Sequence, residues 1–574
     1  MACSRMTPDS APRSVGIVKA LRPGIKAEGG RTVVAPVFWI LLVALALRVV
    51  ASLRTDPVAF DSAVYFEMAD LIRTGRWSEA LSYPYPPLFP ALIASAQHLG
   101  ASAETAGLLI ALAADLLVCF PLIAIARAAA GEVVAWGAAF LWAIHPYAIQ
   151  LGVQALTDAP TAFCVALALW AGLRAVKEGR RLWALGAGAA SGLAYLLRPE
   201  GIEPVLALAA LYLVHADSTT RGESDASVPL SIVESRRSPL GRSGLRRMAW
   251  VLAPLAGWAI VGVPYVAYIS MEAGALTLSK KKSASALLHS LTSPAKEDHS
   301  QGPKELRVQL VPVVEPAGKN VHQTAGTGEP RSQAWLGQAA RSIYIFQKPL
   351  VNGMNPLVLS FGIVGAWSMR FHRGVGRGRV RALLAVLLAL HFIILLGLAA
   401  HNGPAYLGGH HFFLMVIYAL PFAGAGLAWA LTWEIERLRA PRWLLMAVLV
   451  LLVAMTVLWS VTRRPGRGVA VRPAASWIRA QVAGTPVVVT DIAKLTYHAG
   501  AERVVLGGGY DDILRRARAH GAHFVVFYPD LLPQVSHDFL ARLHSSELEL
   551  AKTFPDPSPS APGQRLEIYR LRRR

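Results

Sequence analysis

The chain has 574 residues, of which 54% are hydrophobic and only 16% are charged, whereas about 25% of the residues in ordinary soluble domains are charged. This composition excludes a disordered chain, a collagen-like fibre and an ordinary cytosolic enzyme. The apolar residues fall in long blocks, which predicts an α-helical membrane protein with several spans.

The formal net charge is +21. A basic excess in a soluble protein suggests a nucleic-acid partner. Here the arginines lie in short segments between apolar blocks, as the positive-inside rule describes for membrane proteins. We therefore expect membrane lipids, and no nucleic acid, as partners.

No cofactor is predicted from the pattern of cysteines and histidines. Cys3, Cys119 and Cys164 are too few for a disulfide framework, and no His/Cys cluster has zinc spacing. A divalent metal remains chemically possible for such a protein, but no ligand pattern supports one.

The polar, basic segment 1–32 precedes a first apolar block at 33–53. A signal peptide has a shorter apolar core and a small-residue cleavage site, whereas this block is long enough to span the membrane. It predicts an uncleaved first helix with a cytoplasmic N-terminus.

Four later segments place the remaining spans, because short basic loops stay in the cytoplasm: 174–181, 217–247, 370–381 and 433–443. They predict a transmembrane domain over 33–462 with eleven spans, namely 33–53, 104–126, 132–151, 157–175, 182–197, 201–216, 248–270, 355–369, 382–400, 412–432 and 444–461. External loops are expected at 54–103 and 271–353. The apolar stretch 87–99 is short for a crossing and is interpreted as a re-entrant or interfacial helix.

The composition changes after the last span. Short apolar runs at Val487–Thr490 and Phe524–Tyr528 flank a helical pattern at 510–520. Strand, helix and strand in this order predict a small extracytoplasmic α/β domain over 463–574. Glycines 507–509 fit no phosphate-loop spacing and are interpreted as a tight turn.

Several candidate functional residues lie in the first external loop. A helix starting near Ser62 would place Tyr65 and Met68 on one face, with Asp61 at its N-terminal end. An N-cap role for Asp61 has equal weight, and Glu67 is also compatible with a solvated or structural acid. The sequence Tyr83-Pro84-Tyr85-Pro86-Pro87 predicts a rigid turn back to the membrane.

Further candidates lie at three external corners. Thr157 or Asp158 can cap the helix that Pro160 helps to start, and Asp158 can instead act in a site. Arg198 either favours a helix C-terminus or binds phosphate, and Glu200 follows it. In the segment HNGPAYLGGHH at 401–411, His410 and His411 have no acidic partner nearby, which disfavours a metal site. Asp115 and His391 lie deeper and are interpreted as packed polar residues.

In this order these residues resemble the GT-C glycosyltransferases, in the branch of protein O-mannosyltransferases and aminoarabinose transferases (glycosyltransferase family 39-like). The family's D-x-x-x-Y-x-E motif matches Asp61 to Glu67, and its Pro-Pro-Leu helix matches Pro86 to Leu88. An Asp-Pro corner matches Asp158 to Pro160, and an Arg-Pro-Glu-Gly corner matches Arg198 to Gly201. The resemblance covers about 33–462.

The chain also departs from the family pattern. Ser62 replaces the second acid of the family's Asp-Glu pair, and Pro84-Tyr85 replaces the Glu-Lys of the aminoarabinose enzymes, so their phosphate-contacting lysine is absent. A late R-Y-x-x-P motif looks like His410-His411-Phe412 here.

The resemblance implies a GT-C fold and an enzyme that transfers a sugar from a polyprenyl-phosphate donor. The acceptor would be a hydroxyl of a glycan, lipid or protein, on the extracytoplasmic face of the plasma (inner) membrane. The Ala-, Arg- and Gly-rich composition favours a bacterial source. The resemblance implies Asp61 as the base of an inverting displacement, and Asp158 as a group that orients acceptor or sugar. Arg198 and His411 would stabilise the leaving phosphate, and the remaining substrate-binding candidates are Tyr65, Glu67, Tyr85, Glu200 and His410.

Two alternatives stay open at this point. A flippase or transporter of lipid-linked glycan intermediates would move its substrate without cleaving a bond. A non-catalytic assembly component would keep its function after loss of both Asp61 and Asp158.

Overall fold

The computed structural model describes residues 34–222, 240–280, 347, 349–370, 375–402, 407–437, 442–462, 469–506, 510–529, 542, 547–556 and 564–572. The expectations for the basic segment 1–32, for Cys3, for most of the loop 271–353 and for the glycines 507–509 fall outside these residues.

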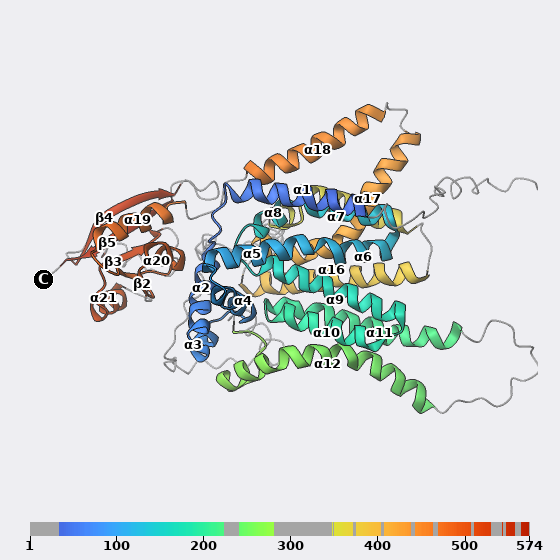
Figure 1. Cartoon of the computed structure of the whole chain (residues 1–574), viewed down its shortest axis with the longest axis horizontal. Coiled ribbons are helices and arrows are strands. Elements are labelled where there is room, and N and C mark those ends of the chain that lie inside the picture. The colour runs from blue at the N-terminus through green and yellow to red at the C-terminus, as the bar shows by residue number, and fades with distance from the viewer. Residues whose placement is uncertain are drawn as a thin grey trace, which may run out of the picture.

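Most of the described chain forms a helical bundle, and a smaller domain that contains the sheet lies at one end of it (Figure 1). In chain order the helices before this domain are α1 (Val34–Ser52), α2 (Phe60–Arg73), α3 (Trp77–Ser82), α4 (Leu88–His98), α5 (Ala103–Leu117), α6 (Cys119–Ala130), α7 (Glu132–Ala143), α8 (Pro146–Gly152), α9 (Asp158–Glu178), α10 (Arg181–Tyr195), η1 (Pro199–Ile202), α11 (Glu203–Gly222), α12 (Leu240–Ala273), α15 (Pro356–Met369), α16 (Val375–Asn402), η3 (Gly409–Phe412), α17 (Phe413–Arg437) and α18 (Arg442–Thr462).

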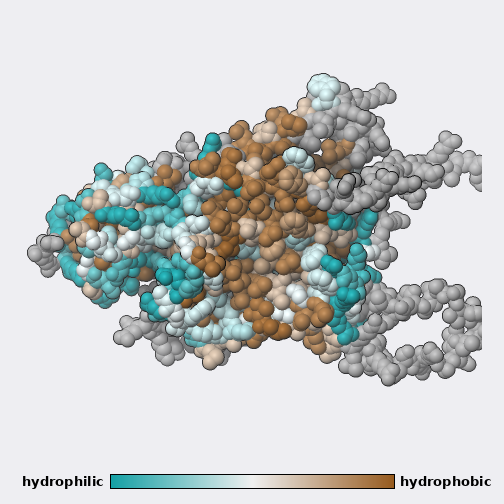
Figure 2. All heavy atoms as spheres, in the orientation of Figure 1, coloured by the Kyte–Doolittle hydropathy of each residue, from teal (hydrophilic) through white to brown (hydrophobic). Residues whose placement is uncertain are grey.

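The bundle has the surface of a membrane domain. Among the residues that the structure describes, six helical stretches are long and apolar enough to cross a bilayer: Ala35–Ser52, Ala103–Ala130, Asp158–Glu178, Arg247–Ala273, Gly376–Ala399 and Gly409–Leu431. Large apolar side chains such as Phe38 and Trp39 are exposed on α1, and a hydrophobic belt crosses the bundle between two hydrophilic ends (Figure 2). The chain is a multi-pass membrane protein, and the number of eleven spans stays a prediction.

Two segments refine the expected threading. The stretch 132–151 is divided into α7 and α8 at His145 and Pro146, because proline is favoured in the first turn of a helix and breaks one that precedes it. Helix α4 has 11 residues, too few to cross a bilayer, which agrees with the non-spanning interpretation of 87–99.

Helix α17 lies at the centre of the bundle. In the apolar stretch Gly409–Leu431, which comprises η3 and most of α17, 89% of the most apolar 18 residues are buried, compared with 22% for Ala35–Ser52 of α1. Glycines allow close packing here: a Cβ atom on Gly365 of α15 would lie 1.7 Å from the carbonyl oxygen of Phe422. Small residues at such contacts let two membrane helices approach closely.

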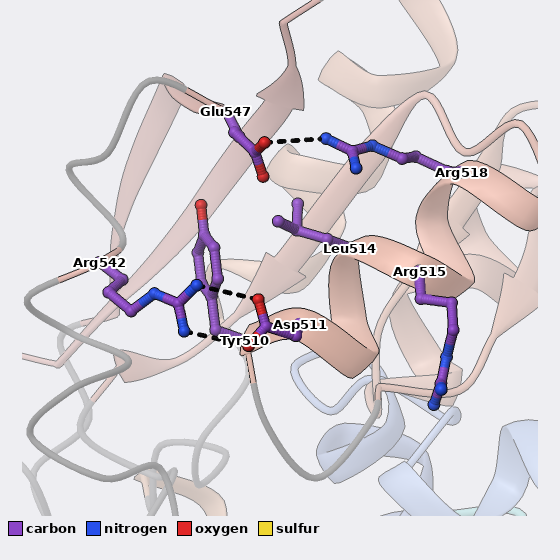
Figure 3. Close-up of a pocket in the computed structure, with 7 residues that line it drawn as sticks. All are labelled: Tyr510, Asp511, Leu514, Arg515, Arg518, Arg542 and Glu547. Atoms are coloured by element: carbon purple, nitrogen blue, oxygen red, sulfur yellow. Dashed lines mark hydrogen bonds and ion pairs between the residues drawn. The ribbon is translucent and has the colours of Figure 1, made fainter.

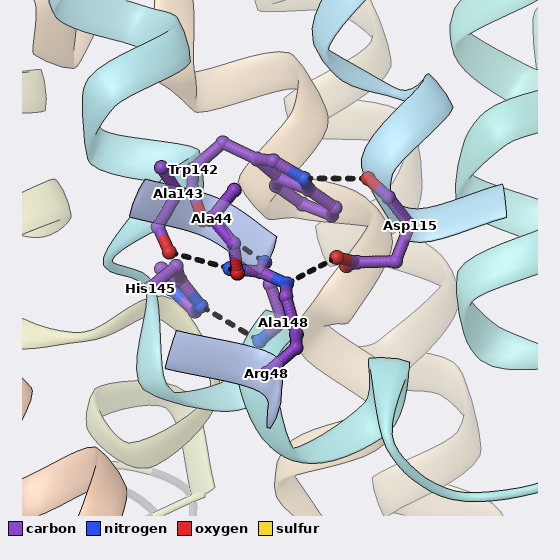
Figure 4. Close-up of polar contacts among 7 residues, drawn as sticks. All are labelled: Ala44, Arg48, Asp115, Trp142, Ala143, His145 and Ala148. Carbon is purple, nitrogen blue, oxygen red and sulfur yellow. Dashed lines mark hydrogen bonds and ion pairs between the residues drawn. The ribbon is translucent and has the colours of Figure 1, made fainter. Parts of the chain in front are cut away.

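A buried ion pair joins the peripheral helix α1 to the bundle (Figure 4). Arg48 Nε lies 2.5 Å from Asp115 Oδ2, and both side chains are fully buried. Arg48 also donates to the carbonyl oxygen of Ala143, at 2.5 Å, and Trp142 Nε1 donates to the backbone oxygen of Asp115, at 3.0 Å. Asp115 is therefore a packed polar residue, as expected, and its partner is on α1.

The C-terminal domain contains α19 (Val471–Gln481), β1 (Val487–Val489), α20 (Ala493–Ala499), β2 (Glu502–Val504), α21 (Tyr510–Ala519), β3 (Phe524–Phe527), β4 (Leu548–Asp556) and β5 (Gln564–Leu571). The strand order is β2-β1-β3-β5-β4, with β1 parallel to β2 and β3, and β5 antiparallel to β3 and β4. The strand–helix–strand pattern agrees with β1, α21 and β3, whereas the β4–β5 hairpin was not predicted.

Candidate active site

The predicted acidic motif lies on α2, in the layer between the bundle and the C-terminal domain (Figure 1). Asp61 occupies the first turn of α2, and Ala59 is the N-cap residue of this helix. The alternative that Asp61 is the N-cap is therefore wrong, because α2 begins one residue earlier, at Phe60. Ala59 N instead donates to Ser62 Oγ at 2.9 Å, and the Asp61 carboxylate faces the neighbouring turn.

The proline-rich turn brings Tyr85 to Asp61. The Tyr85 hydroxyl donates to Asp61 Oδ1 at 3.0 Å. Burial raises the pKa of Tyr85 well above its ordinary value, and the Asp61 charge raises it further. The phenol therefore stays protonated and serves as a hydrogen-bond donor to this carboxylate.

Tyr65 lies one helical turn after Asp61 and forms the floor of this region. Tyr65 and Met68 are both buried, which confirms that they share the inner face of α2. The Tyr65 ring packs edge-on against Tyr85 and Phe89, with centroid separations of 5.1 and 5.4 Å. Aromatic contacts of this geometry stabilise the turn against α2.

The second acid pairs with the predicted arginine. Asp158 is the first residue of α9 and Thr157 is its N-cap, so Asp158 does not cap the helix. Arg198 Nη1 lies 2.6 Å from Asp158 Oδ1, and Arg198 Nε lies 3.7 Å from Glu200 Oε2. Burial disfavours the charge of Arg198, but these carboxylates outweigh burial and raise the pKa of Arg198.

The two groups of residues are neighbours. The charges of Asp61, Asp158 and Arg198 all act on the Tyr65 phenol: burial is the largest effect that raises the pKa of Tyr65, and the two acids add to it. A backbone hydrogen bond from Leu88 N to the Leu196 oxygen joins the start of α4, next to Tyr85, to the corner that contains Arg198. The structure thus brings Asp61 and Tyr85 together with the Asp158–Arg198 pair at the bundle end next to the C-terminal domain.

Glu67 belongs to a different contact on the same helix. Its Oε2 lies 2.7 Å from Arg503 Nη2 on β2 and 3.3 Å from the Tyr83 hydroxyl. Burial raises the pKa of Glu67, while Arg503 opposes this rise. The structural interpretation of Glu67 thus fits its contacts with Arg503 and Tyr83.

The predicted histidines, His410 and His411, lie in η3. The buried His391 connects this segment to the corner that contains Arg198. The rings of His410 and His411 are in contact, with centroids 4.0 Å apart and planes tilted by 36°. The His411 carbonyl oxygen lies 2.7 Å from His391 Nε2, and His391 Nδ1 lies 2.7 Å from Glu203 Oε1. Glu203 begins α11 directly after η1, so this pair ties η3 to the corner that contains Arg198.

Sequence reasoning missed four residues of these contacts: Tyr83, Thr157 as a partner of Tyr65, Glu203 and Arg503. Glu203 had a local signal, since a carboxylate at the start of an apolar block must find a partner. Arg503 had none, because its partner is 436 residues away.

Within the described ranges, no group of three or more His, Cys, Asp or Glu side chains is arranged to hold a metal ion. A pocket of about 610 Å³ lies in the C-terminal domain on α21, where Arg542 contacts Asp511 at 2.9 Å and lies over the Tyr510 ring (Figure 3). None of the predicted site residues lines it.

Comparison with known proteins found a similar family and similar solved structures. A family described as dolichyl-phosphate-mannose-protein mannosyltransferase matches residues 84–228. ArnT from Cupriavidus metallidurans, solved with bound undecaprenyl phosphate, superposes with a TM-score of 0.50 at 14% identity, over 93% of this chain and 98% of that chain. The apo oligosaccharyltransferase of Archaeoglobus fulgidus gives a TM-score of 0.48 at 14% identity, over 86% and 69% of the two chains.

No curated protein matches the chain. The superposition on ArnT covers nearly the whole of both chains and concerns the fold alone at this identity, while the family match adds a sequence relationship over 84–228. The resemblance to the GT-C glycosyltransferases is thereby confirmed, and the chain has their fold.

Proposed function

We propose that this protein is a membrane glycosyltransferase that moves a sugar from a polyprenyl-phosphate donor to an acceptor hydroxyl. The observation that carries this proposal is one polar site at the bundle end. There the Asp61 carboxylate lies in the same region as the ion pair of Asp158 and Arg198, whose Oδ1 and Nη1 atoms are 2.6 Å apart. An acid that accepts a proton and a cation that binds phosphate are the two groups this transfer needs.

The reaction is a single displacement with inversion. The acceptor oxygen attacks the anomeric carbon of the sugar, and the bond between that carbon and the phosphate oxygen breaks. Asp61 takes the proton from the acceptor hydroxyl. The leaving group departs as polyprenyl phosphate, whose negative charge lies against Arg198.

The neighbouring residues orient these groups. Tyr85 donates to Asp61 Oδ1 and so directs the other carboxylate oxygen towards the acceptor. Asp158 holds the guanidinium of Arg198, whose five N–H donors suit a phosphate and only some of which are used by Asp158 and Glu200. His410 and His411, which are only partly buried, would lie along the approach of sugar and lipid phosphate. Tyr65 is buried and supports the Tyr85 ring from below.

The location of the site suits an amphipathic donor. The lipid would lie along the hydrophobic belt of the bundle, with its phosphate at the polar end. We place this end and the C-terminal domain on the extracytoplasmic face of a bacterial inner membrane, since the basic segment 174–181 lies at the opposite end of α9.

Purified protein incubated with a panel of polyprenyl-phosphate sugars tests the proposal. We expect release of free polyprenyl phosphate with one or more donors, and its loss in Asp61→Asn. Asp70→Asn is the matched control, because Asp70 is an exposed acid on the same helix and should leave release unchanged. Movement of the lipid across vesicles without bond cleavage would indicate a transporter instead.

A further inference from the structure

The C-terminal domain contacts the layer of α2 through charges that are divided between the two sides. The acids belong to the membrane domain: Asp56 and Glu67. The bases belong to the C-terminal domain: Arg472, Lys494, His498 and Arg503. This division makes the contact electrostatically complementary, which favours one orientation of the domain.

One cluster centres on Asp56, just before α2. Its carboxylate lies 2.7 Å from Arg472 Nη2, 2.8 Å from Lys494 Nζ and 3.6 Å from His498 Nε2. Burial alone would raise the pKa of Asp56, but its contacts with these three basic side chains outweigh burial and lower it. The cluster therefore attaches the domain at the N-terminal side of α2.

An apolar contact lies between the charged groups. The Tyr497 ring on α20 is 5.1 Å from the Phe66 ring on α2, and Ala493 is buried in the same cluster as Tyr65 and Phe66. Helix α20 thus packs directly on the helix that carries Asp61.

The second cluster reaches the proline-rich turn. Two hydrogen bonds connect α2 with this turn: Tyr85 to Asp61 at 3.0 Å, and Tyr83 to Glu67 at 3.3 Å. Arg503 contacts Glu67 Oε2 at 2.7 Å, the same oxygen that accepts from Tyr83. Only Pro84 separates the two tyrosines, so displacement of Tyr83 also displaces Tyr85.

We propose that Arg503 is a positioning residue for the transfer reaction. It holds Glu67 and Tyr83 in place, and the turn in consequence holds Tyr85 against Asp61. The C-terminal domain therefore contributes to the active site indirectly. Its Arg503 guanidinium positions the turn but does not contact the substrate. This inference rests on the proposed glycosyltransferase function.

Arg503→Gln tests the inference, with Arg472→Gln as the matched control. Both variants remove one arginine–carboxylate contact between the same two parts of the chain, but only Arg503 connects to the turn. We expect Arg503→Gln to lower kcat about tenfold with little change in the donor KM, because a misplaced base slows chemistry more than binding. Arg472→Gln should stay within about twofold of wild type, since Lys494 and His498 still contact Asp56.

Two further measurements separate positioning from general stability. Arg503→Lys should recover much of the lost kcat, because it restores the cation at Glu67. In Arg503→Gln, hydrogen exchange of the α2 amides should increase, while the melting temperature changes little. A double variant Glu67→Gln with Arg503→Gln should be no slower than the slower single variant, since both changes break one contact.

The inference is overturned if Arg503→Gln keeps wild-type kcat and α2 protection, or if Arg472→Gln loses as much activity. Hydrogen exchange tests the contact independently of turnover. If wild type releases no polyprenyl phosphate but α2 exchange still depends on Arg503, then the proposed function fails and the structural link stands.

Discussion

Arg198 and Asp158 form an ion pair, 2.6 Å between Nη1 and Oδ1, although 40 residues separate them. Each lies at the end of a different helix, and their side chains are only 13% and 7% exposed. Because a buried charge is tolerated when it is paired, neither residue is free to be replaced by a neutral one. The pair is therefore the sharpest test of the site.

Replacing Arg198 by lysine should raise the donor KM. Lysine keeps the charge but lacks the planar donors with which Arg198 contacts Asp158 and, in the proposed reaction, would also bind a phosphate. Donor titration of purified Arg198→Lys checks this. Arg76→Lys, a change at an exposed arginine, serves as the control. An unchanged donor KM would exclude phosphate recognition by this guanidinium.

Tyr85→Phe should slow transfer with little effect on folding. The variant keeps the ring contacts with Tyr65 and removes the hydrogen bond to Asp61, and a bond to a charged acceptor contributes about 1.5–3 kcal/mol. If this bond acts in the transition state, kcat should fall about 10- to 100-fold. A kcat equal to wild type would show that Asp61 needs no orientation by Tyr85.

Breaking the Arg48–Asp115 pair should destabilise the protein. Arg48→Leu leaves the fully buried Asp115 without its counter-charge, which costs about 3–5 kcal/mol. The double variant Arg48→Met with Asp115→Leu should recover much of this loss, because two apolar residues replace two charges. Thermal unfolding in detergent measures both, and equal melting of all three proteins would contradict the prediction.

Alanine substitutions at two glycines of α15 should affect the melting temperature differently. Gly365→Ala places a Cβ atom 1.7 Å from the Phe422 carbonyl oxygen, so α15 and α17 must separate. This separation should lower the free energy of unfolding by about 1–3 kcal/mol. A Cβ atom on Gly362 meets nothing within 4 Å. We expect Gly365→Ala to lower the melting temperature and Gly362→Ala to leave it unchanged or slightly higher.

Asp491 should make the C-terminal domain less stable as the pH rises. Burial raises the pKa of Asp491 from 3.8 to about 6, while a hydrogen bond from Leu506 N opposes this rise. The folded state therefore holds this proton more tightly than the unfolded chain, and stability falls between about pH 4 and pH 6. Asp491→Asn should melt higher than wild type at about pH 7, with a smaller difference near pH 4; a constant difference would contradict this.

The sequence by itself determined the class of protein and the positions of most helices. Apolar blocks of span length and the basic segments between them are local properties of the sequence, so they can be recognised without knowing which residues are in contact. The polar corners at Asp158 and Arg198 were also readable, because charged residues beside apolar helices need partners. The β1, α21 and β3 pattern was predicted for the same local reason.

Only the tertiary structure decided which of these groups meet. The pairing of Asp61 with Tyr85, and of Arg198 with Asp158, depends on how four helix ends pack together. Nothing near Glu67 in the sequence points to Arg503, because the two lie in different domains and 436 residues apart. Local patterns record which residues must be buried or paired, but the choice of partner follows from the packing of segments that are distant in the chain.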